Sequence, residues 1–263
     1  MESESQLLGT NQKSTTNRSS VGRTDPGAVR SVNQDSFYID QEQRFFIVAD
    51  GMGGHAGGQE ASQIATKAIQ THLIEFWDED IPSEELLEEA MYKANADILQ
   101  DQYDNPERSD MGTTMVVVAF RQGKAWCAHI GDSRMYRLRG DRLEQITEDH
   151  TWVARALKMG DISLDQARTH PWRHVLFQCL GRKDMRQVEL YPLEMQPKDL
   201  LLLCSDGLTE EVSDAEVSSL LQVEATWEVI AQTLIEAAKE AGGSDNITVV
   251  LISQEGGEDS SVS

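Results

Sequence analysis

The chain has 263 residues, of which 39% are hydrophobic, enough for one large domain with a sizeable core. Lys and Arg total 23 against 45 Asp and Glu, so the formal net charge is −22. A charge this negative repels nucleic acid and anionic lipid, which argues against both as general partners.

The two ends of the chain are expected to be tails around a single domain. Residues 1–20 are rich in Ser, Thr, Asn and Gln, and they have too few apolar side chains to offset the entropy cost of ordering. Residues 255–263 form a short acidic tail of the same kind, which leaves 21–254 as the domain. The first residues do not have the pattern of a signal peptide, and no apolar run approaches the roughly 18 residues that span a bilayer. We therefore expect a cytoplasmic protein that does not enter a membrane.

Helices and strands can be predicted in chain order from the spacing of apolar residues. The patterns indicate a strand at 45–49, a helix at about 59–76, a helix that begins after Pro82 with Ser83 as its N-cap, strands at 115–120, 125–130 and 200–204, a helix at about 226–241 with Gly242 as its C-cap, and a strand at 247–252. Strands and helices do not alternate regularly. This order favours an α+β fold over a doubly wound parallel sheet.

Four of these strands have an aspartate at one end. Asp50, Asp132 and Asp206 follow the strands at 45–49, 125–130 and 200–204, and Asp245 precedes the strand at 247–252. One Asp-Gly pair after a strand usually marks a turn. Four carboxylates gathered at buried strand ends would need a compensating charge, and oxygen ligands of this kind suit Mg²⁺ or Mn²⁺.

Five short motifs connect the chain to a known family. They are R-S-V-N-Q-D at 30–35, D-G-M-G-G at 50–54, G-D-S-R at 131–134, S-D-G at 205–207 and S-D-N at 244–246. In this order they resemble the successive motifs of the PPM family, the PP2C-type metal-dependent protein phosphatases, in its bacterial branch. The resemblance covers roughly residues 21–253. It implies a β-sandwich of two antiparallel sheets flanked by helix pairs, and residues 151–181 resemble the family's flap beside the active site.

The resemblance also implies which residues bind metal. Asp50 would bridge two Mg²⁺ or Mn²⁺ ions, with the carbonyl of Gly51 on the second ion. Asp206 and Asp245 would complete the shell of the first ion. Asp132, together with Asp206, matches the position that holds a third ion in bacterial members.

The remaining roles concern the phosphate and the reaction. Arg30 matches the phosphate-binding arginine, and Asp35 would hold waters bound to the metals. Phosphoserine and phosphothreonine monoesters would be hydrolysed by in-line attack of a hydroxide shared by the two ions. Where the eukaryotic branch has a candidate proton donor, this chain has Met52, which cannot donate a proton. His170 and His174 on the flap are candidates for substrate contact, and a surface or packing role is the alternative for each.

The expected partners are phosphorylated proteins, bound by a monomer. Within the family the chain resembles cyanobacterial members that dephosphorylate the nitrogen-signalling P-II protein, and this resemblance makes P-II a candidate substrate. Two other functions stay open from the sequence alone. One is a Mg²⁺-dependent hydrolase of nucleotides or small phosphoesters. The other is an inactive module that binds phosphoproteins.

Overall fold

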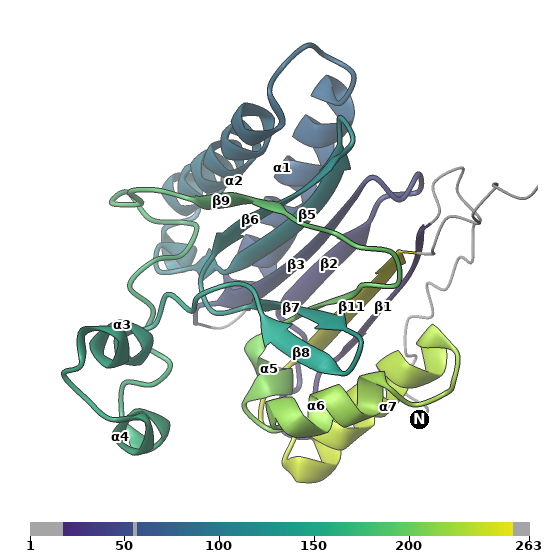
Figure 1. Ribbon diagram of the computed structural model, residues 1–263. Coiled ribbons are helices and arrows are strands. Elements are labelled where there is room, and N and C mark those ends of the chain that lie inside the picture. Colours follow the sequence, from purple (N-terminus) through teal and green to yellow (C-terminus); the bar gives the residue numbers. More distant parts are fainter. Residues whose placement is uncertain (1–17, 55–56, 255–263) are drawn as a thin grey trace, which may run out of the picture.

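The computed structural model describes residues 18–54 and 57–254 and places two antiparallel β-sheets face to face (Figure 1). One sheet has the strand order β1 (Arg18–Asp25), β11 (Ile247–Gln254), β10 (Leu200–Cys204), β7 (Arg134–Arg139) and β8 (Arg142–Gln145). The other has the order β2 (Asp35–Ile39), β3 (Phe45–Met52), β5 (Met115–Arg121), β6 (Lys124–Ile130) and β9 (Glu189–Leu193), and β4 (Gly112–Thr113) pairs with β3. The predicted α+β sandwich is confirmed.

The β3 strand shows why the sheets stack. Successive side chains of a strand point to opposite faces of its sheet. Phe46 and Val48 therefore pack into the core between the two sheets, while Phe45 and Ile47 pack under the helices on the outer face. All four side chains are fully buried. A strand covered on both faces is apolar throughout, which explains why the sequence shows it as a continuous run.

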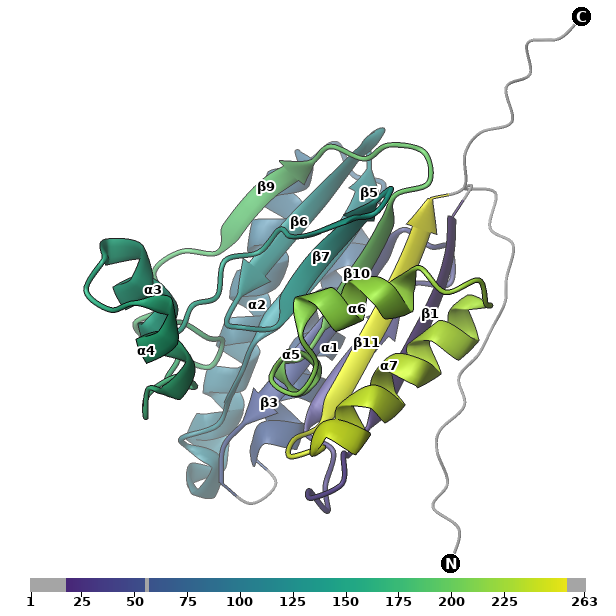
Figure 2. The same cartoon turned by 60° about the horizontal axis from the view of Figure 1, so that its bottom comes forward.

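Helices cover both outer faces of the sandwich, as Figure 2 shows. The pair α1 (Gly57–Phe76) and α2 (Ser83–Asp104) lies on the six-stranded sheet, and the pair α6 (Asp214–Leu221) and α7 (Trp227–Ala241) lies on the other sheet after the short α5 (Asp206–Thr209). A 3₁₀ turn, η1 (Pro106–Arg108), follows α2. The helices α3 (Trp152–Met159) and α4 (Leu164–Thr169) stand beside the sandwich in both views. Within the described residues, no helix is long and apolar enough to cross a membrane.

One helix start differs from the sequence-based prediction. The predicted N-cap Ser83 is the first residue inside α2, and the capping position is held by Pro82. The Ser83 hydroxyl donates to Gln122 Oε1 at 3.1 Å, and no side chain caps the start of this helix. The ends of α7 are as predicted, since Thr226 accepts a hydrogen bond from the Val229 N–H at the N-cap and Gly242 is the C-cap.

The boundary of the predicted N-terminal tail was wrong by three residues. Strand β1 begins at Arg18 and pairs along its length with β11. The Ser19 and Ser253 hydroxyls lie 2.7 Å apart across this pair, and the Arg18 guanidinium lies 4.2 Å from the centre of the Phe120 ring. A strand held by its backbone needs few apolar side chains, so composition did not reveal it. Residues 1–17 and 255–263 of the two expected tails lie outside the described residues.

Candidate active site

A cleft of about 510 Å³ opens where strand ends of the two sheets meet. Its lining brings together most of the residues singled out from the sequence. The lining comprises Arg30, Gln34, Asp50, Gly51, Met52, Gly53, Thr114, Asp132, Arg173, His174, Leu176, Asp206, Glu210, Ser244 and Asp245. All four strand-end aspartates therefore face a common space.

Antiparallel pairing explains why distant aspartates converge. In β2 and β3, Asp35 and Asp50 are direct register partners. In the other sheet, β10 and β11 are antiparallel neighbours. Asp206 follows the end of β10 and Asp245 precedes the start of β11, so the pairing places them at the same end of the sheet. Asp132 lies between β6 and β7, a connection that passes from one sheet to the other.

The carboxylates of the cleft raise one another's pKa values. Burial raises the pKa of Asp50 well above its ordinary value, and the nearby charges of Asp35, Asp206 and Asp132 raise it further. Burial followed by the charge of Asp206 does the same to Asp132, and burial also raises the pKa of Asp206. Carboxylates that oppose one another's ionisation in this way are a site for a compensating cation.

Asp35 lies behind the cleft and joins the two sheets. Its Oδ2 accepts hydrogen bonds from the Ser205 and Thr248 hydroxyls, each at 2.7 Å. Burial is the main reason why the pKa of Asp35 is raised to about 7. Its second oxygen, Oδ1, is buried and has no hydrogen-bond partner among residues 18–54 and 57–254. Asp35 thus reaches from β2 to the strand ends of the other sheet.

The residues of the cleft suit a hard divalent cation. Asp35 Oδ1 and Asp206 Oδ1 are both buried without a hydrogen-bond partner, although buried carboxylate oxygens in proteins are usually satisfied. The strand-end side chains offer only oxygen atoms, the ligand type that Mg²⁺ and Mn²⁺ prefer. Ligand atoms of His174, Asp206 and Glu210 also lie within 4.8 Å of one another. These residues fit the metals that the resemblance implies.

Arg30 lies at the edge of the cleft and is held by its acidic neighbour. Its Nη2 is 2.9 Å from Asp245 Oδ2, and its Nε donates to the Ser244 carbonyl at 3.3 Å. Half of the Arg30 side chain, 51%, is exposed. The guanidinium therefore stands at the rim, where it can meet an incoming anion.

The two flap histidines occupy different places. His174 lines the cleft, and its Nδ1 is 2.5 Å from Glu210 Oε1. Burial lowers the pKa of His174. His170 is not among the residues that line the cleft. Its ring stacks on Trp152 with centroids 4.6 Å apart, and its Nδ1 accepts the Trp172 N–H at 3.1 Å, an arrangement of packed aromatic side chains.

Sequence reasoning missed Glu210 and Arg173, which also line the cleft. Burial, followed by the charge of Asp206, raises the pKa of Glu210 to about 7. Asp206 is the first residue of α5 and Glu210 is its C-cap, a spacing of four residues that puts both on one face and that the sequence does display. Arg173 gave no such signal, because its place depends on the path of the flap.

Comparisons with known proteins agree with this geometry. A family model described as Protein phosphatase 2C matches residues 28–248. The chain is 36% identical over 239 residues to the serine/threonine phosphatase stp of Listeria innocua, a match that covers 88% of this chain and 93% of that protein. The chain belongs to the protein phosphatase 2C family. This membership confirms the predicted enzyme class, a protein serine/threonine phosphatase.

Solved structures of protein phosphatase 2C relatives share the fold. The Mycobacterium tuberculosis serine/threonine phosphatase PstP/Ppp superimposes with a TM-score of 0.82 at 37% identity, over 91% of this chain and 99% of that one. A structure of the catalytic domain of the phosphatase PstP in complex with two manganese ions gives a TM-score of 0.80 at 35% identity, over 91% and 99% of the two chains. The predicted metal dependence is that of the family.

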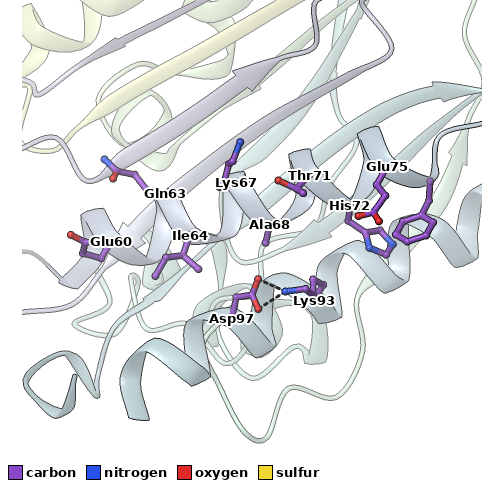
Figure 3. Close-up of a pocket in the computed structure, with 11 residues that line it drawn as sticks. Glu60, Gln63, Ile64, Lys67, Ala68, Thr71, His72, Glu75, Lys93 and Asp97 are labelled. Atoms are coloured by element: carbon purple, nitrogen blue, oxygen red, sulfur yellow. Dashed lines mark hydrogen bonds and ion pairs between the residues drawn. The ribbon is translucent and has the colours of Figure 1, made fainter. Parts of the chain in front are cut away.

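A second groove, of about 520 Å³, does not have the properties of a phosphatase site. It follows the outward side of α1 beside α2, and its lining comes from these two helices (Figure 3). Charges there are balanced locally, since Lys93 Nζ is 2.5 Å from both oxygens of Asp97 and His72 Nε2 is 3.5 Å from Glu89 Oε2. The strand-end aspartates do not contribute to this groove.

Two buried histidines form another cluster in this phosphatase. Ligand atoms of His129, His150 and Glu189 lie within 4.8 Å of one another. His150 Nδ1 accepts the Gly131 N–H at 3.1 Å, so the proton of the neutral ring is on Nε2, which is 3.2 Å from Glu189 Oε1. A metal would need the lone pair at Nε2. The cluster is therefore unsuited to a metal ion in this arrangement.

Proposed function

We propose that this chain removes phosphate from phosphoserine and phosphothreonine residues of proteins with the help of two Mg²⁺ or Mn²⁺ ions. The observation that carries the proposal is the convergence of Asp50, Asp132, Asp206 and Asp245, from separate strand ends, on one cleft with Arg30 at its rim. The raised pKa values of Asp50, Asp132 and Asp206 support it, because burial raises all three and the charges of neighbouring carboxylates raise them further.

Each acidic residue has a proposed role toward the metals. Asp50 would bridge the two ions, with the Gly51 carbonyl on the second, and Asp206 and Asp245 would complete the shell of the first. Asp132, with Asp206, would hold a third ion. When bound, such ions lower the pKa of water from about 15.7 toward 7 and offset the charge of the phosphoryl oxygens.

The side chains of the protein supply binding and orientation. Arg30 presents a planar fork that suits paired phosphate oxygens. Asp35 fixes the strand ends of one sheet against those of the other through Ser205 and Thr248, and this keeps the carboxylates in place. Met52 lines the cleft and has no proton to give. His174, oriented by Glu210, is the side chain in the lining best placed to contact the departing serine or threonine oxygen.

The cellular location, oligomeric state and substrate of this chain are inferred from its sequence alone. We propose a cytoplasmic monomer, and we retain P-II, the nitrogen-signalling protein, as the one named candidate substrate. Phosphorylated P-II therefore belongs among the substrates in the test below.

The test compares substrate classes and metals in one assay. Purified chain is given a phosphothreonyl peptide, phosphorylated P-II, ATP and p-nitrophenyl phosphate, first with Mn²⁺ and then with EDTA. Release of phosphate from the peptide that stops in EDTA is the expected result. Hydrolysis of ATP in preference to every phosphoprotein or phosphopeptide would overturn the proposed substrate class, and binding of the peptide without turnover would indicate an inactive module.

A further inference from the structure

A buried asparagine on α2 holds the end of the flap. Asn95 is 8% exposed and lies on the inward side of the helix between the apolar residues Met91 and Ile98. Its Oδ1 accepts the Gly181 N–H at 2.7 Å and the Arg182 N–H at 3.1 Å, and its Nδ2 donates to the Arg182 carbonyl at 3.2 Å. One side chain thus binds the backbone of both residues at which residues 151–181, the flap, rejoin the sandwich.

A second amide on the same helix secures the same junction. Gln102 Nε2 donates to the Gly181 carbonyl at 2.9 Å and to the Met111 carbonyl at 2.7 Å. Gly181 has φ +90°, and a Cβ at this position would lie 2.8 Å from the Met111 carbonyl oxygen. The junction therefore requires glycine, and its carbonyl is held from the side of α2.

The junction is connected directly to the strand that carries Asp50. Leu180 and Thr113 exchange both backbone hydrogen bonds, at 2.9 and 3.2 Å. The Thr113 hydroxyl donates to the Asp50 carbonyl at 2.8 Å, and Thr113 is the register partner of Gly51. The end of the flap is thus fixed in one step to the backbone of the proposed bridging aspartate.

The flap forms one wall of the cleft close to this junction. Arg173, His174 and Leu176 line the cleft and precede Gly181 by eight residues or fewer. The connecting residues are also tied to the start of the flap, since the Phe177 N–H donates at 2.9 Å to the carbonyl of His150, the residue directly before the flap. A shift at the junction would therefore move the wall of the cleft relative to Asp50.

We propose that Asn95 is a positioning residue for this phosphatase: it sets the flap wall relative to Asp50 and so governs the binding of protein substrates without touching them. The inference rests on the proposed function, because it needs a substrate that contacts the wall. A phosphopeptide extends beyond the phosphate and meets the flap. A small aryl phosphate occupies the carboxylate end of the cleft and depends much less on the wall.

The experiment compares Asn95→Ala with the wild type on both substrates at saturating Mn²⁺. Misplacement of a binding group by about 1 Å can cost up to about 100-fold, so we expect KM for a phosphothreonyl peptide to rise about 10-fold or more. We expect kcat for p-nitrophenyl phosphate to stay within about twofold of wild type. Gln100→Ala is the matched control, because Gln100 Nε2 makes an exposed hydrogen bond to Asp104 on the same helix at 3.0 Å. The control should leave both substrates unaffected.

A conservative variant separates positioning from mere loss of structure. Asn95→Asp keeps an acceptor for the Gly181 and Arg182 N–H groups but loses the donor to the Arg182 carbonyl, so its peptide KM should fall between those of wild type and Asn95→Ala. Thermal unfolding of each variant gives the folded fraction at the assay temperature. If Asn95→Ala does not fold, Asn95→Asp and Gln102→Leu carry the test with the same expected rise in peptide KM.

Two results would overturn the inference. One is a parallel loss on both substrates that follows the folded fraction, which would show a purely structural role. The other is an unchanged KM for the peptide in folded variants. Failure of the proposed function is a separate outcome, since it would show as a wild-type protein that does not release phosphate from the peptide at all.

Discussion

The hydroxyls of Thr114 and Ser133 lie 2.6 Å apart in the core directly behind the cleft. Thr114 Oγ1 also accepts the Asp50 N–H at 3.0 Å, and the Thr114 N–H donates to the Asp50 carbonyl at 2.9 Å. Ser133 directly follows Asp132 in the chain. This pair of hydroxyls therefore fixes the distance between the strand of Asp50 and the turn of Asp132, two residues that we expect to bind metal ions.

Thr114→Val is expected to weaken metal binding more than it weakens the fold. The valine keeps the shape but leaves the Asp50 N–H without its partner, at a cost of about 1–3 kcal/mol. Thr147→Val is the matched control, because buried Thr147 Oγ1 accepts the Met135 N–H at 3.0 Å away from the carboxylates. Urea unfolding should show similar losses for both. Only Thr114→Val should need more Mn²⁺ for half-maximal activity, and equal Mn²⁺ requirements would contradict the role of this pair.

Asp206→Asn should abolish turnover and at the same time stabilise the protein in EDTA. Removal of the Asp206 charge relieves a repulsion that adds to burial in raising the pKa of Asp50. A gain of about 1 kcal/mol would appear as roughly 2–4 °C in Tm. Asp199→Asn is a control with the opposite expected effect on Tm, because buried Asp199 is paired with Arg139 at 2.7 Å. That control should lower Tm, and a fall in Tm for Asp206→Asn would show that the carboxylates are not in conflict.

The pH dependence of stability should also have an unusual sign in EDTA. The pKa of Asp35 is raised from 3.8 to about 7, mainly by burial, and that of Asp50 is raised as well. The folded state therefore holds protons that the unfolded state releases, and the stabilisation is lost as pH rises from about 4 through 7. Calorimetry in EDTA should give a higher Tm at pH 5 than at pH 8. Asp35→Asn should make Tm depend less on pH. A wild-type Tm that rises with pH would show that the pKa values of Asp35 and Asp50 are not raised.

Several strands could be predicted from the sequence because the buried strands are continuous apolar runs. The strand β10 has the predicted bounds, and β3, β5, β6 and β11 differ from the predictions by a few residues at their ends. The strands β1, β2, β7, β8 and β9 were not predicted, since they mix exposed or half-buried polar residues with apolar ones. Such strands are stabilised by pairing with neighbours, which a local pattern does not show.

The same distinction applies to the cleft. Asp50, Asp132, Asp206 and Asp245 could be found because each one adjoins a buried strand whose position is predictable. Whether these strand ends meet depends on the order of the strands in the sheets. The family resemblance of the motifs implied that order, whereas local residue spacing did not show it. Glu210 was missed even though its helix spacing from Asp206 was visible. Arg173, His170 and His174 lie on the flap, whose path depends on α2 and on contacts far away in sequence.

Arg30→Ala should impair substrate binding with little effect on stability. Arg30 and Asp245 form an ion pair at 2.9 Å, but both side chains are partly exposed, so the free energy of unfolding should change by less than about 0.5 kcal/mol. Loss of a charge-assisted contact to phosphate of about 1.5–3 kcal/mol lowers kcat/KM roughly 10- to 150-fold.

Arg30→Lys should recover part of this loss, because lysine keeps the charge but lacks the planar fork. Arg142→Ala removes an arginine that is 77% exposed on β8, and it should leave kcat/KM unchanged. Steady-state kinetics on a phosphothreonyl peptide would measure all three variants, and wild-type kcat/KM for Arg30→Ala would place the phosphate elsewhere in the cleft.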